Sequence, residues 1–364
     1  MAEDLGRRLL MEIEEVHFDK ILQTLRIDRE DDRSYFGLPH LDRLLRVVGQ
    51  TTPNATKTKN VQPIIEFTST SPGGGKTHLS YHLTARATLP PDYGGKGSCA
   101  VIFDTDNAFS VPRLAQQIEL VVRIQTSEVN SGDLDALLLE ALKHVHIFYP
   151  QSLASLTDAL TALPDYLLDK SRHYSFSRRV AFLALDSASA FHWPARAAEE
   201  TAALLAKTNT TNTSSELPNP GYTQLTAALK TATSALQTPA LLTTWHLGPQ
   251  PPPTISHNTS EPPSLRPSLP IPLSQLPTLS FLVRTVAVRR FPAGISIEEA
   301  LREAPDRRKA VEDGKFECVI NAWGIEERLL AKLQKDDAGI GFRILHEGLV
   351  LDQSDTKGEG RVDD

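Results

Sequence analysis

The chain has 364 residues, of which 40% are hydrophobic, and a formal net charge of -7. The hydrophobic content supplies a sizeable core and excludes a wholly disordered protein. The acidic balance excludes a protein that grips nucleic acid over a broad surface, because such binding neutralises phosphates with many basic residues, so any contact with DNA must use a local patch or a partner's surface.

The two cysteines, Cys99 and Cys318, both lie in apolar runs. We interpret them as buried free thiols of an intracellular protein, not as a disulfide. The first thirty residues are densely charged and contain no signal-peptide pattern. No apolar run approaches the roughly 20 residues of a membrane span. The sequence therefore predicts a soluble protein that has no membrane partner.

The N-terminal part, residues 1–60, is expected to be a helical segment followed by a polar linker. Apolar residues over 4–26 recur near helical spacing, and residues 50–60 are polar. The apolar stripe is typical of a helix that packs on its own domain. A docking helix for a partner protein is the alternative.

Short apolar runs then alternate with helical patterns. Strands are expected at 63–68, 100–103, 145–149, 180–185 and 240–244. Helices are expected between them, at 77–89, 112–126, 151–169 and 222–237. This alternation predicts an α/β fold with a mostly parallel central sheet that is covered by helices on both faces. Ligands of such sheets bind at the carboxyl ends of the strands.

Two segments interrupt the alternation. Residues 207–220 are rich in Thr, Asn and Ser, and residues 248–280 are rich in proline and nearly uncharged. Both are expected to be mobile loops of the core domain, which we place at 61–345. A charged tail, 346–364, follows the core. Antiparallel strands are expected to finish the C-terminal edge of the sheet, at 281–290, 316–322 and 342–345.

A glycine-rich turn joins the first strand to the first helix of the core. Glycines there allow backbone N–H groups to surround phosphate oxygens, and the following helix N-terminus favours the same anion. We expect Lys76 to reach the β- and γ-phosphates of ATP, and the Thr77 hydroxyl to coordinate Mg²⁺. An ordinary glycine-rich turn with a chance lysine is the alternative. The predicted nucleotide-binding residues are Thr70, Ser71, Gly73, Gly74, Gly75, Lys76 and Thr77.

Two acidic residues follow predicted strands. Asp186 closes the strand at 180–185, where a P-loop protein holds its magnesium ion; a helix cap or a solvated strand end is the alternative. Asp106 follows the strand at 100–103 and is the candidate catalytic residue that orients the attacking water. Capping of the next helix, or simple solvation, explains Asp106 as well.

Several segments around these residues closely resemble the eukaryotic RecA-family recombinase paralogues. The resemblance is specific over 64–106 and 181–193, and softer over the later strands. It is carried by the runs Ile64–Phe67, Gly75–Thr77, Tyr81–Arg86, Phe103–Asp106 and Asp186–Trp193, and by Leu38–Leu45 before them.

The resemblance implies a RecA-like P-loop ATPase core that binds ATP and Mg²⁺. It also implies a nuclear mediator of homologous-recombination repair of DNA double-strand breaks. Such proteins act in a heteromeric complex with other recombinase paralogues and assist loading of the recombinase filament on single-stranded DNA. Single-stranded or branched DNA would then be met through the complex. The roughly 60 residues before the first strand are too few for the small helical DNA-binding domain of recombinases.

Three departures from the family pattern bear on ATP hydrolysis. Thr70 stands where the P-loop pattern has its first glycine, and Asp106 stands where recombinases have a glutamate. Trp245 follows the strand at 240–244, where the family has an amide that senses the γ-phosphate. An indole cannot accept a hydrogen bond as an amide does. We therefore expect ATP binding with slow or absent hydrolysis.

Other functional classes stay open at this point. A catalytically active P-loop ATPase or motor on DNA is one alternative, and a nucleotide-independent scaffold with a relic P-loop is another. The basic runs at 170–173, 178–179 and 307–309 are the candidates for direct DNA contact. A solvated loop explains each of these runs equally simply.

Overall fold

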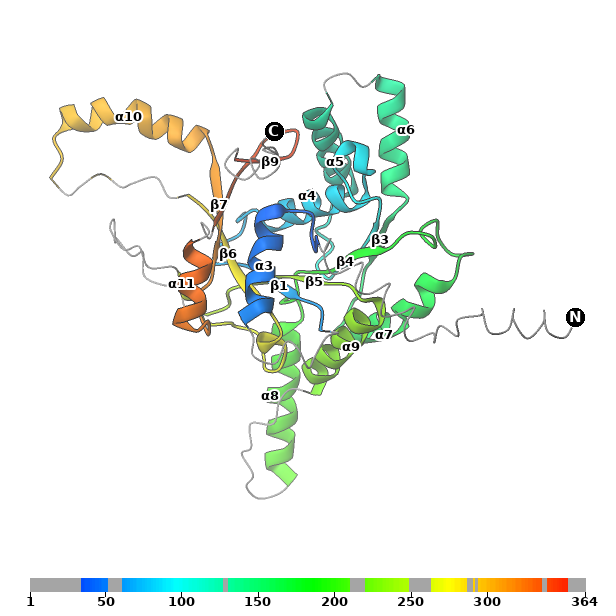
Figure 1. The fold of residues 1–364 in the computed structure, drawn as a ribbon. Helices are drawn as coiled ribbons and strands as arrows, with labels where there is room; N and C mark the ends of the chain where they lie inside the picture. The colour runs from blue at the N-terminus through cyan, green and yellow to red at the C-terminus, as the bar shows by residue number, and fades with distance from the viewer. Residues whose placement is uncertain are drawn as a thin grey trace, which may run out of the picture. The chain divides into compact units, whose positions relative to one another are not determined.

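A nine-stranded sheet, in the order β3-β2-β4-β5-β1-β6-β7-β8-β9, organises the residues that the structure describes (Figure 1). The structure is a computed structural model. It describes residues 34–51, 61–126, 130–209, 220–248, 263–286, 291, 294–335 and 339–352.

The strands of the sheet lie close to the predicted runs. They are β1 (Ile64–Ser69), β2 (Cys99–Asp104), β3 (Val145–Phe148), β4 (Val180–Asp186), β5 (Ala240–Trp245), β6 (Leu279–Thr285), β7 (Lys315–Ile320), β8 (Gly339–Ile344) and β9 (Leu349–Leu351). The first six strands pair in parallel, and β7, β8 and β9 pair antiparallel. The mostly parallel sheet with an antiparallel C-terminal edge is thereby confirmed. One detail differs, since β6 was expected to be antiparallel and instead runs parallel to β1.

Helices cover both faces of the sheet (Figure 1). The chain has α3 (Pro39–Thr51), α4 (Lys76–Thr88), α5 (Val111–Gln125), α6 (Ser131–Leu142), α7 (Leu153–Leu168), α8 (His192–Asn209), α9 (Pro220–Leu236), α10 (Ile297–Glu312) and α11 (Glu327–Lys335). Two short 3₁₀ turns lie in connections of the sheet: η1 (Pro91–Tyr93) between α4 and β2, and η2 (Leu273–Gln275) between β5 and β6. The sequence pattern did not predict α6, α8, α10 or α11.

Alternating side chains of each central strand enter two separate cores. Ile102 of β2 belongs to the core that also contains residues of α3, α4, α5, α6 and α11, whereas its neighbour Phe103 belongs to the core that contains residues of α7 and α9. The same alternation occurs in β4, where Phe182 and Leu183 belong to opposite cores. Successive strand residues point to opposite faces. A strand that is buried on both faces needs apolar residues at nearly every position, which explains the continuous apolar runs in this sequence.

The packed core begins before the first strand. Phe36, Leu41 and Leu44 are almost fully buried in the core on the α4 side. Residues 35–51 thus pack with the sheet, although we had expected the core to start at residue 61. The amphipathic segment at 4–26 and most of the expected linker at 52–60 lie outside the described residues.

Part of the expected proline-rich loop is ordered by packing. Leu269 and Leu273 are buried in the core on the α9 side. Leu265 exchanges two hydrogen bonds with the side-chain amide of Asn321, at 2.7 and 2.8 Å. Residues 263–280 therefore differ from the expected mobile loop because leucines among the prolines bury their side chains. Residues 249–262 and 210–219 and the tail beyond 352 lie outside the described residues.

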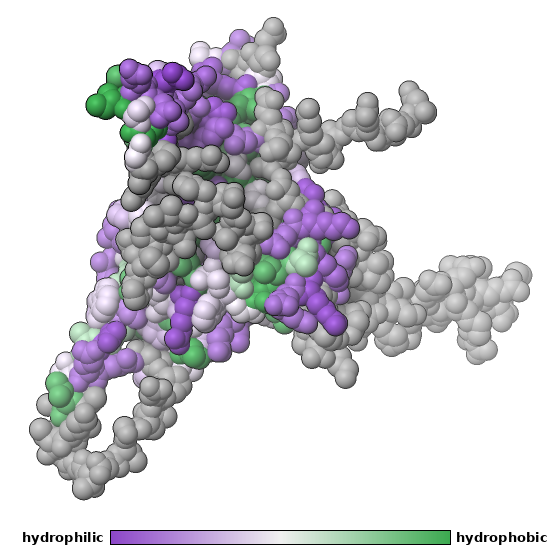
Figure 2. All heavy atoms as spheres, turned by 90° about the vertical axis from the view of Figure 1, so that its left-hand side faces the viewer, coloured by the Kyte–Doolittle hydropathy of each residue, from purple (hydrophilic) through white to green (hydrophobic). Residues whose placement is uncertain are grey.

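The exposed surface is mainly hydrophilic on the face in Figure 2, and hydrophobic residues occur there in small separate groups. Both cysteines are free and buried, as the sequence predicted. Burial raises the pKa of the Cys99 thiol to about 11. Among the described residues, no helix combines the length and the apolar character that crossing a bilayer requires.

Candidate nucleotide-binding site

The turn between β1 and α4 has the backbone form of a phosphate-binding loop. Gly73 and Gly75 adopt left-handed conformations, with φ of 73° and 95°, that favour glycine. Gly74 has no room for a side chain, since an added Cβ would be 2.9 Å from both Ser69 Cβ and the Val283 carbonyl oxygen. Gly75 is also the N-terminal cap of α4 and has no side chain to fill that position. The helix N-terminus therefore stays open toward an anion.

A cavity of about 260 Å³ lies above this turn, at the carboxyl ends of the strands. Seven predicted residues from three separate segments line it: Gly73, Gly74, Gly75, Lys76, Thr77, Asp106 and Asp186. Thr70 and Ser71, which were also predicted to bind nucleotide, are not among its lining residues. The tertiary fold thus brings the turn and both acids to one cavity.

Lys76 is the buried cation of this cavity. Its side chain is only 8% exposed, and its ammonium donates a hydrogen bond to Ser69 Oγ. The same ammonium lies 4.5 Å from the centroid of the Trp245 ring. Burial lowers the pKa of Lys76 to about 8, although the charges of Asp186 and Asp106 oppose the shift. An anion at this position would favour the charged lysine.

Asp186 ends β4 with one oxygen bonded and the other unmatched. Thr243 donates a 2.5 Å hydrogen bond from its hydroxyl to Oδ1. Oδ2 is buried and has no hydrogen-bond partner among the described residues. Burial raises the pKa of Asp186 to about 6, against the hydrogen bond from Thr243. An unmatched buried carboxylate oxygen beside a phosphate-sized cavity fits the chemistry of a hard cation or its bound water.

Asp106 lies at the open side of the cavity. Asp106 is exposed to solvent, and its negative charge raises the pKa of Lys76, which lines the same cavity. The helix-capping alternative for Asp106 is wrong, because Ser110 caps α5 and accepts the backbone N–H of Arg113. The neighbouring Asp104 is buried instead and accepts the backbone N–H groups of Ala108 and Phe109.

Six further residues line the cavity: His78 of α4, Ala108 and Ser187 close after the two acids, and three residues of later strands. Thr243 and Trp245 belong to β5, and Ile344 reaches the cavity from β8. The sequence signal for Thr243 and Trp245 is their place at the end of an apolar strand. Ile344 gave no signal, because it comes from an antiparallel strand about 270 residues after the turn.

Comparisons with known proteins give three related similarities. The chain is 29% identical to DNA repair protein RAD51 homolog 3 of Cricetulus griseus over 109 residues, which are 28% of this chain and 30% of that protein. It is 29% identical to DNA repair and recombination protein RadA of Methanoculleus marisnigri over 86 residues, 20% of this chain and 26% of that protein. It is 30% identical to DNA repair protein XRCC2 of Mus musculus over 121 residues, 33% of this chain and 38% of that protein. No protein-family model matches.

The chain thus resembles the RecA-family recombinase paralogues, XRCC2 among them, and its α/β fold agrees with a RecA-like core. The matched segments span between about a quarter and two fifths of the length of these relatives.

Proposed function

We propose that this chain is an ATP-binding recombinase paralogue that acts as a mediator in homologous-recombination repair of DNA double-strand breaks. Its partners are other recombinase paralogues in a heteromeric complex, which assists loading of the recombinase filament on single-stranded DNA in the nucleus. The three relatives carry the names of DNA repair or DNA repair and recombination proteins, which supports this assignment.

One observation carries the nucleotide-binding part of the proposal. The glycine turn, the buried ammonium of Lys76 and the unmatched oxygen of Asp186 face one cavity. These three features together fit a nucleotide phosphate with its cation. Backbone N–H groups of residues 73–77 would hold the phosphates, and Lys76 would leave Ser69 for the β- and γ-phosphates. Thr77 and Asp186 would hold Mg²⁺, which supplies charge neutralisation at the phosphate oxygens.

Slow ATP hydrolysis belongs to the same proposal. The Trp245 indole has a donor N–H and no acceptor, so it cannot orient a water molecule as an amide does. Asp106 has a side chain one methylene shorter than glutamate and lies on the exposed side of the cavity. ATP then acts as a ligand whose binding stabilises one conformation of the chain, and its hydrolysis does not drive the function.

A titration with a fluorescent ATP analogue, with and without Mg²⁺, tests the binding step. We expect saturable binding by the wild-type chain and a loss of tenfold or more in Lys76→Ala, because a charge-assisted contact to phosphate disappears. Lys309→Ala, on the distant helix α10, is the matched control and should bind as the wild type does. Absence of saturable binding by the wild type would favour the scaffold with a relic P-loop, and equal binding by Lys76→Ala and the wild type would remove Lys76 from the site.

A single-turnover hydrolysis assay separates the mediator from an active motor. We expect turnover to stay slow when single-stranded DNA is added. Brisk DNA-stimulated hydrolysis would instead favour the active ATPase or motor. Co-purification from nuclear extract, followed by mass spectrometry, tests the complex, and recovery of no recombinase paralogue would contradict it.

A further inference from the structure

The segment at 169–179, between α7 and β4, presents two aromatic rings to solvent. Tyr174 is 76% exposed and Phe176 is 53% exposed. The residue between them, Ser175, is 3% exposed. Because neighbouring side chains in this short stretch alternate, the buried serine directs both rings away from the protein. Large exposed aromatic side chains at this spacing call for an explanation.

A buried hydrogen-bond chain fixes Ser175 in place. Its hydroxyl oxygen lies 2.9 Å from His144 Nδ1 and 2.9 Å from His146 Nε2. The outer nitrogens of these histidines reach Glu140 Oε1 at 3.1 Å and the Tyr166 hydroxyl at 3.0 Å. A hydroxyl group donates one hydrogen bond and accepts others, so one set of neutral tautomers satisfies the whole chain, with Tyr166 as its first donor and Glu140 as its last acceptor. The segment is therefore anchored to the start of β3.

Basic side chains lie in this segment and next to it. Lys143, at the end of α6, has its ammonium 5.7 Å from the centroid of the Tyr174 ring. The segment itself adds two exposed residues, Lys170 and Arg172, and two that lead into β4, Arg178 and Arg179. Its one acid, Asp169, is exposed and accepts hydrogen bonds from Ser171. A second acid, Glu140 of α6, pairs with Lys143 at 3.1 Å and with Arg178 at 3.5 Å. Five basic residues thus stand against two acids, so the patch keeps a positive excess on a chain whose total charge is negative.

We propose that this surface, the Tyr174–Phe176 platform, binds single-stranded nucleic acid. Exposed rings stack on unpaired bases regardless of base identity, and nearby cations follow the phosphate backbone. A duplex offers no free base faces to the rings, because its bases already stack on one another. A rigid platform also loses little conformational freedom on binding, which favours affinity. The site lies away from the nucleotide cavity and goes beyond the function proposed above.

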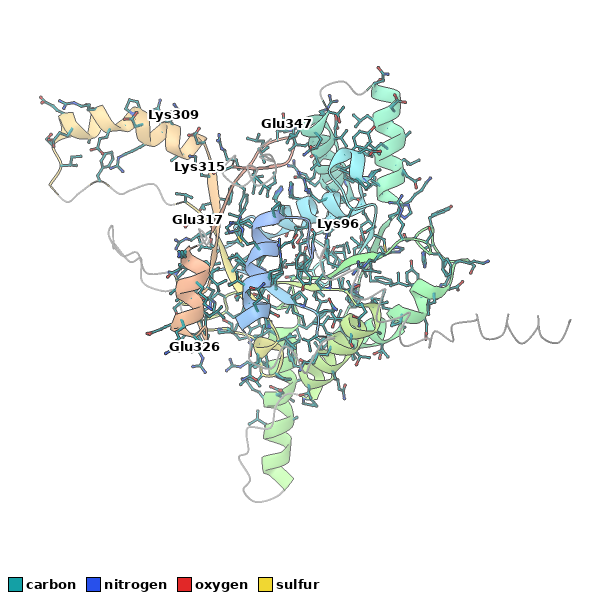
Figure 3. All side chains as sticks on the ribbon, in the orientation of Figure 1. Lys96, Lys309, Lys315, Glu317, Glu326 and Glu347 are labelled. Carbon is teal, nitrogen blue, oxygen red and sulfur yellow. The ribbon has the colours of Figure 1, made fainter. Side chains whose placement is uncertain are left out.

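The other basic run, Arg307 to Lys309 on α10, fits nucleic acid less well. Arg307 pairs with Glu303 and lies 3.9 Å from the centroid of the Phe291 ring. Helix α10 carries five acids and four bases, so it has no positive excess as a whole. Figure 1 shows α10 and β3 on opposite sides of the sheet, and Figure 3 shows Lys309 on α10. The two basic regions cannot form one surface.

Fluorescence anisotropy with labelled 30-nucleotide oligo-dT and oligo-rU, on the full chain, tests the platform. The double variant Tyr174→Ala, Phe176→Ala should bind about thirtyfold more weakly or worse, since each ring loses a stacked base. Lys170→Ala with Arg172→Ala should reduce the slope of log affinity against log salt by roughly 1.4. The oligonucleotide that binds more tightly shows whether the platform prefers DNA or RNA.

Matched controls come from exposed residues elsewhere. Tyr149→Ala, just after β3, removes a ring that is 49% exposed, and Arg123→Ala with Arg196→Ala removes two exposed cations. All three control changes should leave binding unchanged, and thermal melts should show that every variant is folded. Wild-type binding that survives loss of both rings, or absence of wild-type binding at low salt, overturns the proposal. ATP-analogue binding by the platform variants tests the proposed function separately. If that function holds, these variants bind the analogue as the wild type does, whether or not the platform binds nucleic acid.

Discussion

The ammonium of Lys76 lies 4.5 Å from the centroid of the Trp245 ring, where the ends of β1 and β5 lie side by side. Ser69 and Trp245 are register partners at these strand ends, so the sheet itself sets the distance. The Lys76 ammonium is thereby held by an aromatic face and a serine hydroxyl. A cation on a tryptophan face of this kind contributes about 0.5–2 kcal/mol.

Nucleotide binding should therefore change the fluorescence of Trp245. Phosphates would draw Lys76 away from the indole ring and alter its electrostatic surroundings. We expect Mg²⁺-ATP to shift the emission of a variant that keeps Trp245 while Trp193→Phe and Trp323→Phe remove the other tryptophans. Adding Lys76→Met should abolish the shift. An unchanged emission spectrum at a nucleotide concentration that saturates binding would contradict the displacement of Lys76.

Asp186→Asn should separate stability from magnesium binding. The pKa of Asp186 is raised to about 6, so its ionised form costs folding free energy above that pH. The neutral amide should raise the unfolding free energy by about 1–2 kcal/mol at pH 7.5. This gain should shrink as the pH falls from 6 toward 4, where the native carboxyl becomes protonated. Urea titrations at several pH values measure it.

The same substitution should weaken the response to Mg²⁺. An amide oxygen is a poorer ligand for a hard cation than a carboxylate, so Mg²⁺-dependent ATP affinity should fall tenfold or more. The exposed Asp92→Asn is the control and should retain both affinity and stability. A full magnesium response in Asp186→Asn would remove this residue from the metal site.

Gly74→Ala should distort the phosphate-binding turn. The new Cβ would meet Ser69 Cβ and the Val283 carbonyl at 2.9 Å each, and the carbonyl cannot move without disturbing β6. We expect a loss of about 1–3 kcal/mol in unfolding free energy. Gly132→Ala, in α6 with no atom within 4 Å of the new Cβ, should be neutral or stabilise by up to about 1 kcal/mol. Equal stability of both variants would mean that the turn has room for a side chain.

Acid should loosen the anchored segment at 169–179 through His146. Burial lowers the pKa of His146 to about 4, so the folded protein keeps this imidazole neutral while the unfolded chain protonates it near 6.5. The unfolded state then binds more protons, and stability falls as the pH drops from 6.5 to 4, by about 2–3 kcal/mol for this residue. His146→Gln should flatten that part of the stability profile. A profile identical to the wild type would exclude His146 as its cause.

Much of the sheet was predictable because its strands are buried on both faces. Apolar runs such as the one ending at Asp186 match their strands to within a residue or two. The predictions failed where local pattern and tertiary packing diverged. Helix α10 is highly charged and contains Pro305, so its sequence gives no apolar stripe. The leucines of 263–280 were hidden among prolines, although Leu273 is 1% exposed.

The sequence by itself determined the chemistry at the turn: glycines that free backbone N–H groups, a lysine, a hydroxyl, and acids placed after apolar strands. These features depend on residue type and local spacing, which the chain carries directly. Only the tertiary structure decided that Thr243 occupies one oxygen of Asp186 and leaves the other unmatched, and that Ser175 turns two rings outward. Both depend on strand register and on contacts between distant segments, which local patterns do not encode.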